Sequence, residues 1–415
     1  MVDVEVEVTP TPTRTKLEME TIPDRRAWRG PLLEVRDLTV SFPTDDGLVH
    51  AVDNLSFVLR DNEVLGIVGE SGSGKTVTSL SVLGLLPKTA QVSGEILFCG
   101  RNILGLKERD MTGLRGNRIA MVFQDALAAL NPVVTVGWQI AEAVSVHQDL
   151  SKAELKDRVV ELLSLVGIPN PRDRATQYPH EYSGGMRQRA MIAMTIANDP
   201  DVLIADEPTT ALDVTIQAQV LDVLERVAEK TSSSILLITH DLGVVAGVAD
   251  RVMVMYAGRE AELGTVEEVF YKPSHPYTQG LLASLPRIDR RDSEKLHRIV
   301  GQPPSLIFVP TGCAFHPRCP EAELPGRCNT EQPRLTELSL SHLSACHFAE
   351  RLLSEAPELP RELSFEPPPP VSEEPEASTE PDEPEDLESE AFTEPDEPED
   401  LESEGSEEPT ESEEA

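Results

Sequence analysis

The sequence predicts an α/β fold, in which helices flank a central sheet and a ligand binds at the carboxyl ends of the strands. Three observations lead to this prediction. Short apolar runs of strand length alternate with longer runs of helical spacing through the middle of the chain. A glycine-rich loop joins one of these strands, residues 64–68, to the helical run that follows it. Other apolar strands end in carboxylate, amide or imidazole side chains.

Length and composition limit the class of protein. The 415 residues could form two or three domains, and 39% of them are hydrophobic, which is enough for a buried core. No apolar run approaches the roughly 18 residues of a membrane-spanning helix. Residues 1–21 lack the charged and apolar regions of a secretory signal. We therefore expect a cytosolic protein that meets a membrane only through partners.

The formal net charge of −37 is concentrated at one end of the chain. Residues 356–415 hold 25 Asp and Glu against one Arg, so this segment carries −24 and the preceding 355 residues carry only −13. Neither part offers the basic face that binding to nucleic acid requires, so no nucleic-acid partner is expected.

Both ends of the chain are expected to lie outside the folded domains. Residues 1–31 mix Pro, Thr and charged residues without an apolar period, which is typical of a flexible leader. Within residues 351–415, the stretch TEPDEPEDLESE occurs at 379–390 and again at 393–404. A repeat this polar cannot bury a core, so the tail is predicted to be disordered. A docking tail for basic partners, a solubility aid and a dispensable appendage are its possible roles.

Residues 32–42 and 49–59 alternate apolar and polar side chains on either side of the turn-rich stretch PTDDG, and they predict a β-hairpin. After this hairpin comes the stretch GESGSGKT at residues 69–76, which fits the phosphate-binding pattern G-x-x-x-x-G-K-[ST]. Backbone N–H groups can cradle phosphate oxygens only where side chains do not obstruct them, which accounts for the glycines. A dinucleotide loop is excluded because Val77 stands where that pattern needs a third glycine.

This phosphate loop predicts a site for a nucleoside triphosphate with Mg²⁺. Lys75 is expected to reach the β- and γ-phosphates, and the Thr76 hydroxyl to ligate Mg²⁺. Phe42, at the end of the first hairpin strand, is a candidate either to stack on adenine or to belong to the core. The rest of the loop is expected to surround the phosphates: Gly69, Glu70, Ser71, Gly72, Ser73 and Gly74.

A second motif, YSGGMRQR at residues 182–189, opens a helical run. Ser183 and the backbone N–H groups of Gly184 and Gly185 would form another anion site at a helix N-terminus. The stretch closely resembles the signature motif of ABC-type ATPases, from which it departs at Tyr182 and Met186. That resemblance implies that Ser183, Gly184 and Gly185 contact the γ-phosphate bound by the other protomer.

Other site residues follow from the same resemblance. Asp206, at the end of the apolar run 201–205, is implied to hold Mg²⁺ together with Thr76, and its neighbour Glu207 to polarise the attacking water. Because adjacent residues of a strand point to opposite sides, each carboxylate can serve a different partner.

Three single residues complete the implied site. Gln124 follows the expected strand 118–123 and falls at the Q-loop position, where the family uses Gln to touch Mg²⁺ and water and to couple the site to a transmembrane partner. His240 follows the strand 235–238 at the position of the switch histidine. Asp213 falls in the D-loop, which contributes to the partner's ATP.

The resemblance implies the ABC form of the P-loop NTPase fold across residues 32–285, with a RecA-like core, an antiparallel β subdomain and a helical subdomain. One phosphate loop and one signature motif per chain imply that the ATP sites form with a second copy or with a paralogous subunit. Stretches at 124–132, 209–221 and 272–282 are similar to ATPase subunits of oligopeptide, dipeptide and nickel importers.

For such a subunit the family implies two transmembrane permease subunits, an extracytoplasmic substrate-binding protein and a place at the cytoplasmic face of the cell membrane. Peptides are the expected solute. Nickel, glutathione or another small solute is the alternative, and a soluble ABC ATPase without a transport role is a more distant one.

Four of the five cysteines fall in the expected C-terminal extension, residues 286–350. Cytosolic thiols stay reduced, so such a group suggests a metal before it suggests disulfides. The closely spaced pair typical of zinc sites is missing. The spacing suits a [4Fe–4S] cluster, which some members of the peptide-importer group carry at this position. Zinc and unligated thiols are the alternatives for these residues: Cys313, Cys319, Cys328 and Cys346.

Overall fold

The computed structural model describes residues 22–124, 129–209, 214–285 and 298–355. The chain divides into two compact units, residues 1–363 and 364–415, and all described residues belong to the first. The acidic repeat and most of the expected leader therefore lie outside the described residues. The last part of that leader contains a short 3₁₀ helix, η1 (Arg25–Ala27), in which Arg25 forms an ion pair with Asp61.

A four-stranded antiparallel sheet confirms the predicted hairpin. Its strand order is β2-β1-β4-β5. The register pairs Leu33 with Leu59 at one end of the hairpin and Thr44 with Gly47 at the other. The strands are β1 (Leu33–Thr44), β2 (Gly47–Leu59), β4 (Gln91–Phe98) and β5 (Arg101–Asn102).

A second sheet of eight strands forms the centre of the fold, in the order β11-β12-β10-β9-β3-β8-β7-β6. The five strands from β9 to β6 are parallel, and β10 and β12 add to the β9 edge in antiparallel orientation. The strands are β3 (Val64–Val68), β6 (Ile119–Val122), β7 (Val202–Asp206), β8 (Ser234–Thr239), β9 (Arg251–Tyr256), β10 (Arg259–Thr265), β11 (Thr336–Glu337) and β12 (Leu343–Ser344).

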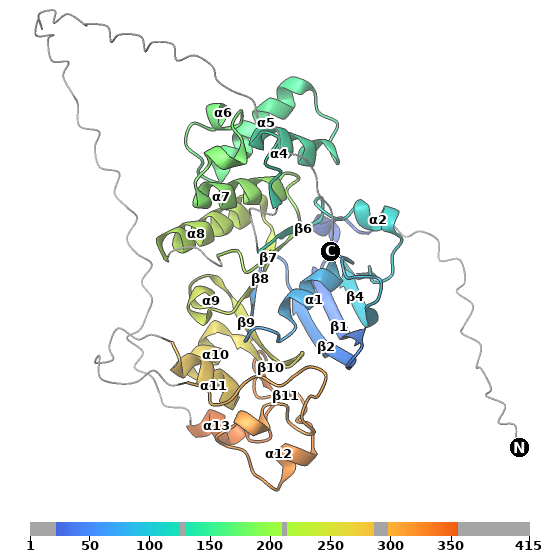
Figure 1. Cartoon of the computed structure of the whole chain (residues 1–415), viewed down its shortest axis with the longest axis vertical. Coiled ribbons are helices and arrows are strands. Elements are labelled where there is room, and N and C mark those ends of the chain that lie inside the picture. Colours follow the sequence, from blue (N-terminus) through green and yellow to red (C-terminus); the bar gives the residue numbers. More distant parts are fainter. Residues whose placement is uncertain (1–21, 125–128, 210–213, 286–297, 356–415) are drawn as a thin grey trace, which may run out of the picture. The chain divides into compact units, whose positions relative to one another are not determined.

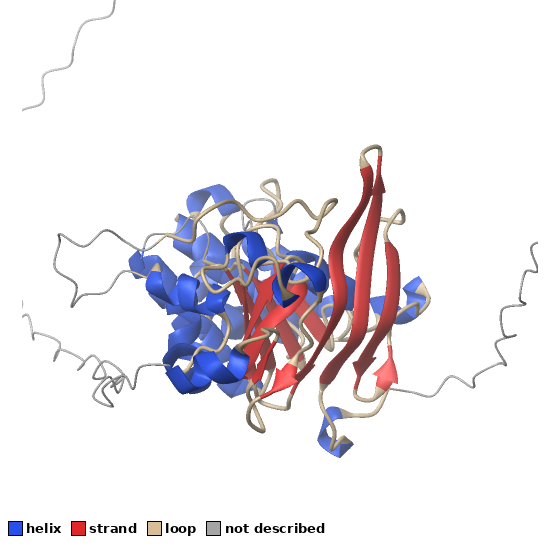
Figure 2. Cartoon of the chain, turned by 90° about the horizontal axis from the view of Figure 1, so that it is seen from below, coloured by secondary structure: helices blue, strands red, loops and turns tan. Residues whose placement is uncertain are grey.

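The parallel strands are mostly apolar because both faces of this sheet are covered. In β8, Ile235 and Leu237 belong to one core cluster with the helices, whereas Leu236 and Ile238 belong to a second cluster with the antiparallel sheet. Figure 2 shows this layering, with helices on one side of the central sheet and the antiparallel sheet on the other.

Two helices begin where the sequence analysis expects helical runs, α1 (Lys75–Val82) at the end of the phosphate loop and α7 (Gly184–Thr195) within the stretch 182–189. Helix α5 (Lys152–Leu165) begins with a capping box, in which the Glu154 N–H donates to Ser151 Oγ (3.4 Å) and Glu154 Oε2 accepts from the Ser151 N–H (2.9 Å). Figure 1 shows α4 to α7 gathered beside the β6 edge of the sheet. The helices are α1 (Lys75–Val82), α2 (Glu108–Thr112), α4 (Val136–Ser145), α5 (Lys152–Leu165), α6 (Pro171–Arg174), α7 (Gly184–Thr195), α8 (Val214–Thr231), α9 (Leu242–Val248), α10 (Val266–Tyr271), α11 (Pro276–Ala283), α12 (Arg327–Thr330) and α13 (Ala349–Glu355).

The described part of the expected extension, residues 298–350, joins the central sheet, and helix α13 continues to Glu355, so residues 351–355 are helical where the sequence analysis expected the disordered tail to begin. Strand β12 pairs with β10, with Leu343 opposite Leu263. The neighbouring residue of β10, Glu262, has a fully buried carboxylate that lies 2.7 Å from His342 Nε2 and also accepts a hydrogen bond from the Ser274 N–H (2.7 Å). A buried carboxylate needs such partners to offset its lost hydration, so this network ties the extension to the end of the ATPase-like core.

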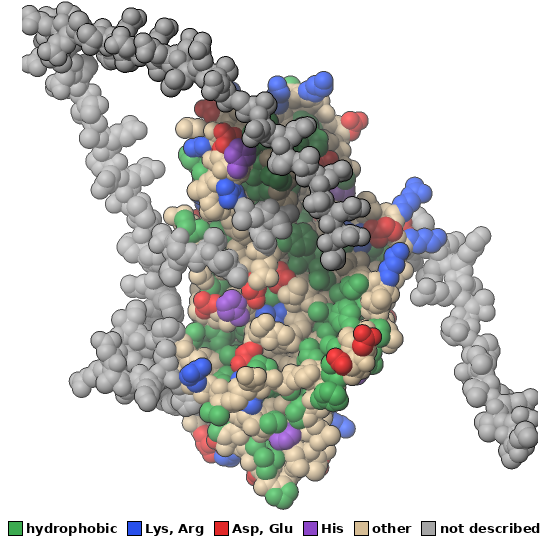
Figure 3. Space-filling model, in the orientation of Figure 1, with side chains coloured by type: hydrophobic (Ala, Val, Ile, Leu, Met, Phe, Trp, Pro, Cys, Tyr) green, Lys and Arg blue, Asp and Glu red, His purple; other side chains and the backbone are tan. Residues whose placement is uncertain are grey.

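On the face drawn in Figure 3, Lys and Arg side chains stand in small separate groups among acidic ones. None of the helices in the described part of the chain is long and apolar enough to cross a bilayer.

Candidate nucleotide-binding site

The phosphate loop lies between β3 and α1, as the sequence predicts. Glycine is required at both ends of the loop by close backbone approaches. A Cβ added to Gly69 would lie 2.3 Å from the Met255 carbonyl oxygen, and one added to Gly74 would lie 2.4 Å from that of Ala51. Gly74 also has a φ of +100°, which strains any L side chain.

Two polar side chains of this loop suit a phosphate ligand. Lys75 Nζ donates to the carbonyl oxygens of Gly69 (2.7 Å) and Glu70 (3.1 Å), and burial lowers the pKa of its ammonium group. Among the described residues, the buried Ser73 hydroxyl has no hydrogen-bond partner. Open space faces Gly72, where no atom lies within 4 Å of an added Cβ. The loop therefore has donors and room for the phosphates of a nucleotide.

The expected magnesium ligands meet beside this loop. Thr76 Oγ1 donates to Asp206 Oδ1 at 3.3 Å, and Asp206 is only 3% exposed at the end of β7. Burial raises the pKa of the Asp206 carboxyl group, and the hydrogen bond from Thr76 partly opposes this shift. A hydroxyl and a carboxylate are the oxygen ligands that Mg²⁺ prefers, so these two residues fit the ion.

Glu207 follows Asp206, but the separation of the two side chains does not come from simple strand alternation. β7 ends at Asp206, and Glu207 adopts a φ of +47°, held by a hydrogen bond from its N–H to the Ile238 carbonyl (2.8 Å). Gln124 Nε2 donates to Glu207 Oε2 at 3.0 Å, and His240 Nδ1 lies 3.4 Å from Glu207 Oε1. The structure thus brings Gln124, Glu207 and His240 together.

The strand order explains why these residues meet. β3, β8, β7 and β6 are consecutive neighbours and run parallel, so their carboxyl ends lie at one edge of the sheet. There they form a cleft of about 640 Å³, lined by Ala51, Gly69, Glu70, Ser71, Gly72, Gly74, Lys75, Thr76, Val77, Gln124, Glu207, His240, Leu281 and Leu306. The sequence analysis did not predict Ala51, Val77, Leu281 or Leu306 as site residues, although Ala51 falls in the expected hairpin strand 49–59 and Leu281 in the stretch 272–282.

Phe42 is not among the residues that line this cleft. It lies opposite Val49 in the hairpin and packs, half-buried, against the second core cluster. Stacking of Phe42 on adenine stays a prediction.

The signature motif lies elsewhere on the surface. Ser183 is the N-cap of α7 and accepts a hydrogen bond from the Met186 N–H (3.3 Å). Ser183 and Gly184 are exposed, and no atom lies within 4 Å of a Cβ added to Gly184. None of Ser183, Gly184 and Gly185 lines the cleft of their own chain. Their contact with a partner's nucleotide stays a prediction, and Asp213 lies outside the described residues.

The structure does not support a metal at the four late cysteines. All four belong to the described residues, yet these residues contain no group of three His, Cys, Asp or Glu side chains placed to hold a metal ion. Burial raises the pKa of Cys319 to about 12 and that of Cys346 to about 11, which favours thiols over the thiolates that ligate metals. The fifth cysteine, Cys99, is buried beside the second core cluster.

The fold and the site together define an ATPase of the ABC transporter type. The family model described as ABC transporter matches residues 52–210, and that of the oligopeptide/dipeptide transporter C-terminal region matches residues 261–325. In fold, the chain is similar to the dimeric ABC transporter cassette MJ0796, with a TM-score of 0.51 and 24% identity over 56% of this chain and 98% of that one. It is also similar to cbiO1 from Clostridium perfringens, with a TM-score of 0.50 and 28% identity over 58% and 91%.

Comparison with curated relatives identifies the family within this class of ATPase. The chain is 52% identical to the dipeptide transport ATP-binding protein DppD of Bacillus subtilis, over 77% of this chain and 95% of the relative. It is 51% identical to the oligopeptide transport ATP-binding protein OppD of Salmonella typhimurium, over 76% and 93%. The chain therefore belongs to the family of oligopeptide and dipeptide transport ATP-binding proteins, which confirms the resemblance drawn from its motifs.

Proposed function

We propose that this chain binds and hydrolyses ATP to power the import of peptides through a membrane permease. The observation that carries the proposal is the 52% identity to a dipeptide transport ATP-binding protein, which extends over nearly the whole of that relative. The separate match of residues 261–325 to the oligopeptide/dipeptide C-terminal region supports peptides over nickel or glutathione as the solute.

The geometry of the cleft supports a role for each side chain. Lys75 and the loop N–H groups bind the phosphates, and Thr76 and Asp206 hold Mg²⁺, which offsets negative charge on the phosphate oxygens. Glu207 accepts the hydrogen bond of the attacking water and orients it. Gln124 and His240 hold the Glu207 carboxylate from two sides, at 3.0 and 3.4 Å.

A second ATPase subunit would complete this site. Within one chain the exposed Ser183 and Gly184 do not line the cleft that holds Lys75. Two chains that face each other would bring the α7 N-terminus of one to the phosphates of the other, where backbone N–H groups and the helix dipole favour an anion. We propose a second copy or a paralogous subunit in this role.

An apolar groove beside Gln124 suits the permease. The groove has a volume of about 400 Å³ between the central sheet and the helices α4 and α7, and its walls include Leu85, Met121 and Phe123. Leu85 and Phe123 are 42% and 44% exposed. We propose that a short helix of a permease subunit places its apolar face here, at the cytoplasmic face of the membrane. An extracytoplasmic binding protein would deliver the peptide.

Reconstitution tests the proposal. The chain is assembled with its permease and ATPase partners in vesicles, and uptake of labelled di- and oligopeptides is measured with and without MgATP. ATP-dependent peptide uptake that Glu207→Gln abolishes is the expected result. Uptake of nickel or glutathione with no uptake of peptides would contradict the peptide assignment and leave the ATPase assignment intact.

A [4Fe–4S] cluster on Cys313, Cys319, Cys328 and Cys346 is a separate proposal, on which import does not depend. Its support is the presence of four cysteines in one extension, two of which are neighbours, since the Cys313 N–H donates to the Cys328 carbonyl at 2.9 Å. The described geometry, which offers no metal-holding group, counts against it. Iron content and absorption near 400 nm of anaerobically purified protein decide between a bound cluster and free thiols.

A further inference from the structure

The C-terminal extension reaches the phosphate loop through one ion pair. Arg318, at the end of the short 3₁₀ helix η3 (His316–Arg318), faces the carboxylate of Glu70, the second residue of the loop. Arg318 Nη1 donates to Glu70 Oε2 at 2.5 Å and Nη2 donates to Oε1 at 2.9 Å. The Arg318 side chain is 5% exposed and that of Glu70 is 28% exposed. A two-pronged, largely buried pair of this kind is among the strongest side-chain contacts.

Arg318 is held rigidly in this position. Its Nη1 also donates to the Tyr256 hydroxyl (3.3 Å), and its Nε donates to the Val300 carbonyl (3.3 Å). The guanidinium carbon lies 5.8 Å from the centre of the Tyr256 ring and 5.9 Å from that of Phe315, within range of cation–π attraction. Arg318 therefore offers Glu70 a fixed charge at low entropic cost.

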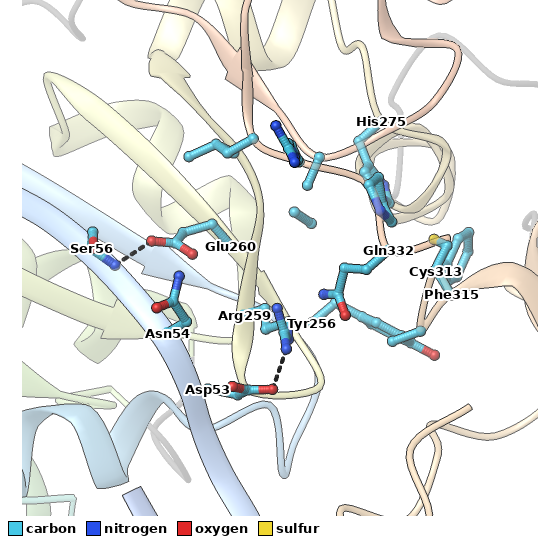
Figure 4. A pocket seen from close by; sticks show the side chains of 16 residues that line it. Asp53, Asn54, Ser56, Tyr256, Arg259, Glu260, His275, Cys313, Phe315 and Gln332 are labelled. Carbon is cyan, nitrogen blue, oxygen red and sulfur yellow. Dashed lines mark hydrogen bonds and ion pairs between the residues drawn. The ribbon is translucent and has the colours of Figure 1, made fainter. Parts of the chain in front are cut away.

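The same Tyr256 and Phe315 form part of the wall of a second cavity. This cavity, of about 540 Å³, lies where β2 and β10 meet the extension. Figure 4 shows it with Ser56 and Glu260 on one side and Cys313 and Phe315 on the other. The two rings are in edge contact, 5.2 Å between centres. The rings that position Arg318 are thus part of the junction between core and extension.

Each polar group of Glu70 has a hydrogen-bond or ion-pair partner. Its N–H donates to the Tyr277 hydroxyl (2.9 Å), its carbonyl accepts from Lys75 Nζ (3.1 Å), and its carboxylate pairs with Arg318. Glu70 lines the same cleft as Lys75 and Thr76. Without a counterion, its carboxylate would repel the triphosphate bound next to it.

We propose that Arg318 is a positioning residue of the ATP site, supplied in cis by the C-terminal extension. It neutralises Glu70 and fixes the entrance of the phosphate loop, so the affinity for MgATP depends on the docked extension. The proposal rests on ATP binding alone and is independent of the transported solute.

The test compares MgATP binding by full-length variants, measured by titration calorimetry. Arg318→Met is expected to raise the Kd for MgATP about tenfold, because it leaves an unpaired carboxylate beside the phosphates. The matched control is Arg351→Met. Arg351 lies in α13, directly after the extension, where it pairs with Glu321 at 2.9 Å and stacks over Phe348, but its side chain is 47% exposed and does not line the cleft. Its replacement is expected to leave the Kd unchanged.

A double variant separates electrostatic positioning from a merely structural role. Adding Glu70→Gln to Arg318→Met removes the unpaired charge, so it is expected to recover most of the lost affinity. Where Arg318→Met does not fold, Arg318→Lys replaces it, with a smaller rise in Kd of about threefold because the charge stays and only the two-pronged contact with Glu70 is lost. An unchanged Kd in the Arg318 variant, or a loss that Glu70→Gln does not relieve, would overturn the proposal. Neither result would bear on peptide import.

Discussion

The amide nitrogen of Gln124 donates a hydrogen bond of 3.0 Å to the carboxylate of Glu207, from the end of β6 to the end of the neighbouring β7. Gln124 follows Phe123 directly, and Phe123 lines the apolar groove that we assign to the permease. Phe123, which lines the groove, and Gln124, which contacts the Glu207 carboxylate, are therefore adjacent in the sequence. A partner that shifts this groove would move the hydrogen bond on which the orientation of Glu207 depends.

Replacing Glu207 by Gln is expected to separate binding from turnover. The amide keeps the size of the side chain but cannot accept a proton from water, so ATP hydrolysis should fall about 10²- to 10⁴-fold. Binding of MgATP, and the closed pair of subunits that it holds together, should persist. Phosphate release and size-exclusion chromatography with MgATP measure the two effects. The exposed Glu229→Gln on α8 is the control, and normal hydrolysis by Glu207→Gln would refute the role of Glu207.

Replacing Lys75 by Ala should weaken nucleotide binding itself. The variant loses the ammonium group that reaches the phosphates and, with it, the contacts to the Gly69 and Glu70 carbonyls. We expect the Kd for MgATP to rise by roughly tenfold or more. Titration calorimetry measures it against Lys156→Ala, which removes an exposed lysine from α5. Equal affinities for the two variants would contradict the assignment.

The ionised carboxylate of Asp206 is expected to lower the stability of the folded protein, although function requires it. Burial raises the pKa of its carboxyl group, so the folded protein binds this proton more tightly than the unfolded chain does. The stability that it contributes is therefore present at low pH and is lost as the pH rises through the raised pKa. At pH 7 without Mg²⁺ or nucleotide, Asp206→Asn is expected to raise the melting temperature by a few degrees, and to abolish Mg²⁺-dependent hydrolysis. A lower melting temperature would show that the carboxylate stabilises the fold.

Glu260 should give the protein a dependence of stability on pH near neutrality. It lies in β10 and accepts a hydrogen bond from the Ser56 N–H, and burial raises its pKa from 4.5 to about 7. The folded state therefore favours the protonated carboxyl, and this contribution is lost as the pH rises through about 7. Between pH 5 and pH 8, as set by these two pKa values, the wild-type melting temperature should fall relative to that of Glu260→Gln.

The control for this measurement is Glu267→Gln, on the exposed face of α10. It should reproduce the wild-type profile across the same range of pH. Parallel profiles for the wild type and Glu260→Gln would mean that Glu260 titrates in the folded protein as it does in the unfolded chain.

The longer strands could be predicted because each is either an apolar run or an alternation of apolar and polar residues, bounded by a turn or a polar residue. The run at 64–68 and the hairpin are examples, and both appear in the structure. Strands β11 and β12 could not be predicted, since each has only two residues and so shows no pattern. The order of the strands also lies beyond a pattern in the sequence, because it depends on which apolar faces pack together in space.

The candidate site likewise contains residues that could be predicted from the sequence and residues that could not. Lys75 falls in a motif whose spacing reflects local geometry, whereas Asp206 and Glu207 were expected through the resemblance to a known family. The pair formed by Glu70 and Arg318 spans 248 residues, and nothing near Arg318 in the sequence marks it as part of a nucleotide site. Leu306 reaches the cleft for a similar reason, since its carbonyl accepts a hydrogen bond from the N–H of His50 in the distant hairpin. Long-range contacts of this kind appear only once the chain has folded.

The two short strands of the extension have a consequence for shortened forms of this protein. A chain cut after residue 285 would lack β12 and leave one edge of β10 unpaired, at residues 261–264 that are buried in the full chain. Unpaired backbone groups along an exposed strand edge recruit strands from other molecules. Fragments trimmed to the minimal ATPase should therefore aggregate or form non-native oligomers. In the full chain, β12 prevents this by pairing with β10.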